Sequence, residues 1–187
     1  MKSTNKFIVS PKGVSNYVNE KEINGKTIIV NTSIENANDT NRIGIIKALP
    51  LNYSGNIEVG DEVVVQHNVF REYFDVKGVT RKSPFHITED LFEVAKDLIF
   101  LIIKNGEYIS VDDFCFIKPI FKTERWLGEV EQKHIGIVKF SNRMLEKILV
   151  FKDDLITFMK DSEYQFEINN EILYRMRIEN ILAKIIQ

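Results

Sequence analysis

Short runs in which apolar and polar residues alternate recur along the chain and predict β-strands. Examples are "EVVVQ" (62–66), "LITFM" (155–159) and "QFEIN" (165–169), which are rich in β-branched or aromatic residues and are bounded by Gly, Asn, Asp or Ser. Several such strands at short spacing are typical of small antiparallel barrels. The pattern therefore predicts an all-β protein.

Three segments need a separate interpretation. "NRMLEKILVF" (142–151) has a mixed period and can hold a helical turn. "KNGEY" (104–108) has Asn-Gly between two β-prone runs, which predicts a hairpin. The C-terminal segment 171–187 has helical propensity, but the internal repeat described next favours a hairpin strand, a short turn and a final strand.

The chain contains two similar copies of one pattern. The segment from Arg42 aligns without a gap with the segment from His134, at an offset of 92. "FIVSP" from Phe7 resembles "FIKP" from Phe116 at an offset of 109, so the first copy carries 17 extra residues between its first two strands. The aligned groups are 43–47 with 135–139, 61–64 with 153–156, and 73–76 with 165–168.

This comparison predicts two tandem antiparallel barrels, 1–103 and 104–187. The first contains an insertion, 12–41, which the second lacks. The first copy also has an extra polar segment between Gly78 and Asp90.

The insertion contains "INGKTIIVNTSI" (23–34), in which Ile28, Ile29 and Val30 form an apolar triplet among polar residues. One interpretation is a plain hairpin with a type I′ turn at Asn24-Gly25. The other is an exposed, mobile segment that binds another protein. Both hold if the hairpin projects from the barrel.

Composition excludes several classes of protein. The 187 residues are 44% hydrophobic and 28% charged, as in ordinary globular proteins. A net charge of −2 predicts no nucleic-acid partner and no binding to anionic membranes. No apolar run approaches the roughly 20 residues that span a bilayer, and the N-terminus lacks the apolar core of a signal peptide. A lone cysteine, Cys115, cannot form an internal disulfide, so we expect a cytoplasmic protein.

Candidate chemistry is sparse. His67, His86 and His134 are not at metal-ligand spacing, and Cys115 lies between two phenylalanines as a small core residue would. "GKT" (25–27) lacks the upstream glycine of a phosphate-binding loop, because position 20 is Glu20. The adjacent aspartates of "VDDF" and "KDDL" would point to opposite faces of a strand. We therefore expect no enzyme activity, no metal and no cofactor.

Two further features have ordinary explanations. The aromatic segment from His67 to Asp75 is expected to pack in the core or to line a contact between copies or subunits. Trp126 lies in the short loop of the second copy and would indicate a partner contact if it were exposed.

Taken together, these motifs resemble the bacterial co-chaperonin (GroES) family. "GIIKALP" followed by "VGDEVVV" is similar to the family's strand and Val-Gly-Asp turn, and Asn180–Ile185 is similar to its final strand. "EINNEILY" (167–174) resembles the preceding hairpin, and Gly25–Val30 resembles the mobile loop between the first two strands. The second copy has Phe151-Lys152-Asp153 at the Val-Gly-Asp position and no mobile-loop segment. The two-copy arrangement resembles phage-encoded co-chaperonin-like proteins.

The resemblance implies two tandem GroES-like barrels and a co-chaperonin that caps the folding chamber of a GroEL-type chaperonin. It implies that Ile28, Ile29 and Val30 form the chaperonin-binding site. It also implies a homo-oligomeric ring, in which the first strand, "FIVSP", and the last, "ILAKII", pair between neighbouring subunits. The alternative is a structural or assembly protein, of the kind found in virions, that uses the same fold without binding a chaperonin.

Overall fold

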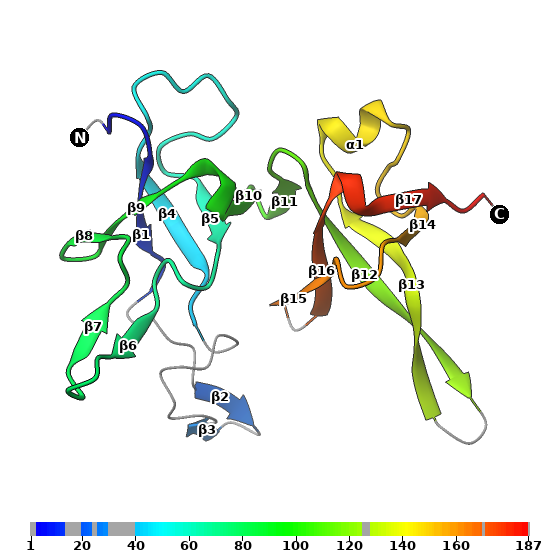
Figure 1. Cartoon of the computed structure of the whole chain (residues 1–187), viewed down its shortest axis with the longest axis horizontal. Coiled ribbons are helices and arrows are strands. Elements are labelled where there is room, and N and C mark those ends of the chain that lie inside the picture. Colours follow the sequence, from blue (N-terminus) through cyan, green and yellow to red (C-terminus); the bar gives the residue numbers. More distant parts are fainter. Residues whose placement is uncertain are drawn as a thin grey trace. The chain divides into compact units, whose positions relative to one another are not determined.

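The chain divides into two compact units, Met1–Glu107 and Tyr108–Gln187. The computed structural model describes residues 3–13, 20–23, 26–29, 40–124, 128–169 and 171–186 (Figure 1). The boundary expected from the sequence, between residues 103 and 104, falls inside strand β10 (Ile99–Lys104).

The first unit is built on one antiparallel sheet. The seven-stranded sheet contains β1 (Phe7–Pro11), β4 (Ile43–Ala48), β5 (Glu62–Val65), β8 (His86–Thr88), β9 (Leu91–Val94) and β10, with β11 (Glu107–Ser110) at the edge beside β10. The 3-10 turn η1 (Lys96–Leu98) precedes β10. Two hairpins form separate two-stranded sheets: β2 (Glu20–Ile23) with β3 (Lys26–Ile29), and β6 (Glu72–Phe74) with β7 (Thr80–Lys82). The chain leaves through Asn105-Gly106, where both φ angles are positive, into β11 (Glu107–Ser110). That turn confirms the hairpin predicted from Asn-Gly.

The second unit has a six-stranded antiparallel sheet and one short helix. Its strands are β12 (Phe114–Glu124), β13 (Gly128–Phe140), β14 (Leu155–Phe158), β15 (Tyr164–Ile168), β16 (Glu171–Arg177) and β17 (Ile181–Lys184). Helix α1 (Arg143–Lys147) supplies the helical turn expected within 142–151. The C-terminal segment forms β16, the 3-10 turn η2 (Ile178–Asn180) and β17, which confirms the predicted strand, turn and strand.

Both units have the same strand order. In the first, six neighbouring strands run β10-β5-β4-β1-β9-β8, and in the second they run β17-β14-β13-β12-β16-β15. The all-β prediction is therefore confirmed. Within the described residues neither sheet is closed, because the strands at its two ends are not paired with each other.

Residue pairing fixes the correspondence between the two units. Pro11 lies opposite Gly44 in the first sheet, and Pro119 lies opposite Gly136 in the second. Each ladder has an irregularity at the same place, after Ile8 and after Phe116. The first strands therefore correspond at an offset of 108, and the predicted offset of 109 is wrong by one residue.

The alignment of the later strands also needs correction. Ile45 pairs with Glu62, and Ile137 pairs with Leu155, so β5 and β14 correspond at an offset of 93 rather than 92. Asp61 is thus equivalent to Asp154. The predicted match of 73–76 with 165–168 is wrong, because β15 occupies the place of β8 rather than that of β6.

The two units differ in what they add to this sheet. The extra segment of the first unit was expected between Gly78 and Asp90, but the structure places it in the β6–β7 hairpin, because β8 has a counterpart. The second copy was expected to lack an excursion between its first two strands. Instead β12 and β13 extend into an arm in which Phe121–Glu124 pairs with residues 128–131.

Aromatic and aliphatic side chains fill the interior of each unit. Phe7, Phe70 and Phe92 are fully buried in the first unit, and Phe70 and Phe92 meet edge to face at 5.0 Å between ring centroids. In the second unit Phe116 and Phe166 form a similar contact at 5.5 Å. These large side chains bury much of the apolar area of each unit.

Candidate functional site

The candidate binding triplet lies on the β2–β3 hairpin. Ile28 pairs with Lys21 and Ile29 with Glu20, so both isoleucines belong to a paired strand, as the hairpin interpretation predicts. Val30 lies outside the described residues. The hairpin is a two-stranded sheet of its own, separate from the ladder of the first unit.

Hydrogen bonds join the two ends of the insertion where it leaves the sheet. The buried Asn41 side chain donates from Nδ2 to the Lys12 carbonyl oxygen (2.9 Å) and accepts from the Ile43 N–H (2.9 Å). The Lys12 N–H also donates to the Ile43 carbonyl oxygen at 2.8 Å. The start and end of the insertion are therefore held at the sheet by the Asn41 side chain and by one main-chain hydrogen bond.

The arm of the second unit leaves its sheet at the equivalent point, after Pro119. Tyr174 donates from its hydroxyl to Glu131 at 2.8 Å, which ties the arm to β16. Burial, reinforced by Glu131, raises the pKa of Tyr174 to about 12, so this donor keeps its proton. Trp126, between β12 and β13 in the sequence, lies outside the described residues.

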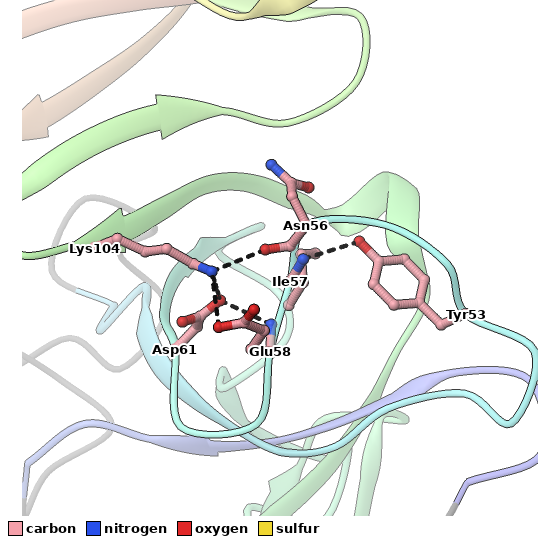
Figure 2. A network of polar contacts seen from close by, with 6 residues as sticks. All are labelled: Tyr53, Asn56, Ile57, Glu58, Asp61 and Lys104. Atoms are coloured by element: carbon pink, nitrogen blue, oxygen red, sulfur yellow. Dashed lines mark hydrogen bonds and ion pairs between the residues drawn. The ribbon is translucent and has the colours of Figure 1, made fainter.

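The Val-Gly-Asp turn before β5 is held by a network of polar contacts (Figure 2). Lys104 Nζ lies 3.2 Å from Asp61 Oδ2 and 3.2 Å from Glu58 Oε2, and it donates to the Asn56 carbonyl oxygen at 3.0 Å. Burial alone would lower the pKa of Lys104, but the hydrogen bonds to Asp61 and Glu58 raise it. Asp61 also accepts from the Glu58 N–H. The network fixes the turn, and the Lys104 ammonium group contacts an oxygen of each of three residues.

The second unit repeats this turn one residue later than the sequence alignment placed it. Asp154 accepts from the Phe151 N–H at 2.7 Å, as Asp61 accepts from Glu58 at 2.8 Å. Gly60 and Asp153 both have a positive φ, of 97° and 70°. Lys152-Asp153-Asp154 is thus the counterpart of Val59-Gly60-Asp61, and the earlier assignment to Phe151-Lys152-Asp153 is corrected.

The remaining sequence candidates lie apart on different elements. Cys115 is fully buried in the second unit, and burial raises the pKa of its thiol to about 12. His67 is half-buried, and burial together with Arg42 and Arg71 lowers its pKa. His134 stacks edge to face on Phe158 in the second unit. Among the described residues no group of three or more His, Cys, Asp or Glu side chains could hold a metal ion.

The aromatic segment from His67 to Asp75 divides into two parts. Val69 and Phe70 are fully buried, as core packing predicts. Tyr73 and Phe74 are exposed, on the β6–β7 hairpin. Only the second part is therefore open to a partner.

No protein-family model and no curated protein matches the chain. In the described part of the molecule, no helix combines the length and the apolar character needed to cross a membrane.

Proposed function

We propose that this protein is a co-chaperonin, which caps the folding chamber of a GroEL-type chaperonin in the cytoplasm and assists ATP-dependent folding by that partner. The main support is the position of Ile28 and Ile29. They lie on the β2–β3 hairpin, inside the insertion between the first two strands of the sheet. This is where the co-chaperonin resemblance places the binding loop.

The two units are, in this proposal, tandem GroES-like barrels. Their common strand order supports one fold used twice. The turn built on Asp61 and repeated on Asp154 supports the same conclusion, because the Val-Gly-Asp motif carries much of the resemblance. Neither unit supplies a catalytic group in this interpretation, and the energy for folding comes from the partner's ATP.

Several weak contacts would act together in such a protein. Burying one aliphatic side chain of the triplet contributes roughly 1.5–3 kcal/mol, while fixing the backbone costs about 1–2 kcal/mol per residue. One insertion alone would therefore bind weakly. A homo-oligomeric ring presents several insertions at once, and the high effective concentration multiplies their affinity. Because each chain carries two units, we propose a ring with fewer chains than a single-copy co-chaperonin uses.

One premise of the ring needs correction. The first strand was expected to be free to pair with a neighbouring subunit, but β1 lies between β4 and β9 inside the sheet. The last strand, β17, is at an edge and has one described neighbour, β14. Subunit contacts must therefore use surfaces other than the first strand.

The test is a variant in which Ile28, Ile29 and Val30 are all replaced by Ser. We expect wild-type protein to co-sediment with a GroEL-type chaperonin when ATP is present, and the variant to lose this binding while keeping its thermal transition. A matched control replaces three exposed apolar residues elsewhere, Leu51, Val59 and Leu182, by Ser. Loss of the thermal transition in the triplet variant would show that the triplet belongs to the hydrophobic core and is not a binding site.

A different result favours the alternative function. If wild-type protein assembles but binds no chaperonin with or without ATP, the co-chaperonin proposal is wrong. The structural or assembly role then explains the fold better, since a fold alone does not fix a function.

A further inference from the structure

One surface differs in character between the two units. In the first unit it carries Lys12, Glu62 and Lys104, with Lys12 and Glu62 paired at 2.7 Å. The residue pairing described above makes the equivalent positions Ile120, Leu155 and Ile186. Three charged positions have thus become aliphatic in the second unit, on the same backbone.

The aliphatic replacements line a shallow hollow beside β17. Its apolar wall consists of Ile120, Ile135, Ile137, Leu155, Ile185 and Ile186. Ile186 is 88% exposed. Asp153, Asp154 and Lys184 also line the hollow, and Lys184 pairs with Asp154 at 2.6 Å, which leaves Asp153 as the acidic group that a partner can meet. The other five aliphatic residues are partly buried, so the hollow offers a partner the exposed side chain of Ile186 and the accessible edges of the rest.

The first unit carries a projection that suits this hollow. At the tip of the β6–β7 hairpin Val76 is fully exposed, and Phe74 and Val79 are about half exposed. Asp75 fixes the tip: its Oδ1 accepts from the N–H groups of Lys77 and Val79, both at 2.9 Å. Because the turn is already ordered, presenting these side chains to a partner costs little further conformational entropy.

We propose that the β6–β7 tip of one copy binds in the hollow of the second unit of another copy. Val76, Phe74 and Val79 meet the aliphatic wall, and Lys77 meets Asp153. The charges are complementary and the apolar surfaces are of similar kind.

A second copy fits as the occupant because the tip's exposed apolar residues match the aliphatic wall and Lys77 is complementary in charge to Asp153. Among the described residues the second unit has no counterpart of the hairpin, and the first unit has charged residues where the hollow is aliphatic. A contact between two different surfaces of one chain is head-to-tail, and it closes into a ring when the rotation between copies permits. This contact specifies how the proposed homo-oligomer is held together, and it is independent of chaperonin binding.

The first experiment compares Val76→Asp with a matched control, Leu51→Asp, by sedimentation velocity. Both residues are exposed on the first unit, and neither change removes an acceptor of the Asp75 turn. We expect wild-type protein and the control to self-associate equally, and Val76→Asp to self-associate at least about tenfold more weakly. An unchanged assembly in Val76→Asp overturns the contact, and so does a wild-type protein that stays monomeric at about 100 µM.

The second experiment alters the hollow with residues that the first unit already carries at the equivalent positions. The variant Ile120→Lys/Leu155→Glu/Ile186→Lys should remain folded and lose self-association. Mixing it with Val76→Asp should give a 1:1 dimer, because one variant keeps the hairpin and the other keeps the hollow. A mixture that stays monomeric, or two variants that each still form the wild-type assembly, contradicts a head-to-tail contact. Chaperonin co-sedimentation is measured separately, so a failure of that function is distinguished from a failure of this contact.

Discussion

Lys184 Nζ lies 2.6 Å from Asp154 Oδ2 and joins the last strand of the second unit to the turn before β14. The same ammonium group donates to the Leu149 carbonyl oxygen at 3.3 Å and lies 5.4 Å from the centre of the Phe151 ring. In the first unit the equivalent aspartate, Asp61, forms an ion pair with Lys104. Lys104 lies on β10, the counterpart of β17. A lysine from that strand therefore holds the aspartate turn in both units.

We expect Asp154 to make stability depend on acid pH. The side chain of Lys184 and the Phe151 N–H lower the pKa of Asp154 below its ordinary value of 3.8. The stabilisation is therefore complete above pH 3.8 and is lost as the pH falls through the lower pKa of the folded state. Asp154→Asn should lower the melting temperature at pH 7, and its difference from wild type should shrink below pH about 4. Asp161→Asn, at an exposed turn, serves as the control, and an equal loss in both variants would contradict the prediction.

Gly44 and Gly136 are expected to tolerate no side chain. A Cβ at Gly44 would lie 2.8 Å from Phe70 Cζ and against Val9, and one at Gly136 would lie 2.8 Å from the Lys118 carbonyl oxygen. Each alanine variant should lower the free energy of unfolding by about 1–3 kcal/mol. Denaturant titration measures this, with Lys47→Ala on the exposed side of the same strand as the control. An alanine variant as stable as wild type would contradict the prediction, because it would show that the neighbouring strand can move to make room for a Cβ with no loss of stability.

Asn142 is expected to be the most important polar residue of the second unit. Its Oδ1 accepts from the N–H groups of Met144 and Leu145 at the start of α1. Its Nδ2 donates to the carbonyl oxygens of Asp112 and Phe114. Asn142→Ala removes all four bonds and should cost about 2–4 kcal/mol of stability. Asn142→Asp keeps the helix cap but turns a carboxylate oxygen toward the carbonyl oxygens of Asp112 and Phe114, so chemical denaturation at pH 7 should also show a large loss of stability.

Cys115 is expected to react only when the second unit unfolds. Its side chain is fully buried, and burial raises its pKa to about 12, so the native thiol stays protonated at pH 8. A thiol reagent should label the native protein slowly and the denatured protein at the rate of a free cysteine. Fast labelling under native conditions would contradict the burial of this β12 residue.

The β-rich character could be read from the sequence because alternation of apolar and polar residues is a local property. The Asn105-Gly106 turn was equally local. The segment 171–187 was predicted correctly as strand, turn and strand for a different reason. Its local propensity is helical, and only the comparison with the first copy indicated the order β16, η2, β17, which repeats β9, η1, β10.

The correspondence between the copies was less predictable. Similar patterns on both sides of Asp153 and Asp154 allow an alignment at 92 or 93, and the pairing of Ile137 with Leu155 and the hydrogen bond from the Phe151 N–H to Asp154 decide for 93. A one-residue slip normally swaps the two faces of a strand, but the continuous apolar run Val63–Val65 fits at either offset and hides the error. Segment 73–76 was misassigned for another reason, because its aromatic residues resemble a core strand although Tyr73 and Phe74 are exposed.

The sequence predicted where the candidate chaperonin-binding residues lie in the chain, but not what they contact. The sequence placed Ile28 and Ile29 in an insertion and offered a hairpin, which the pairing with Lys21 and Glu20 bears out. The hollow of the second unit was missed, since the exchange of Lys12, Glu62 and Lys104 for aliphatic residues becomes visible only when the alignment is corrected. A correct alignment of the two copies would have shown this exchange and so would have indicated the hollow.

The pairing of Pro11 with Gly44, repeated by Pro119 with Gly136, has a practical consequence for engineering. Each pair ends the continuous ladder before the chain departs, so the peptide beyond it can change in length without altering the register behind it. Lengthening such a segment is inexpensive, since doubling a flexible loop costs only about 0.6 kcal/mol in closure entropy. The two units already display this with excursions of very different length. The segment that joins β12 to β13 is therefore a suitable place to graft a foreign epitope or an affinity tag, with the β12–β16 pairing as the reporter of an intact scaffold.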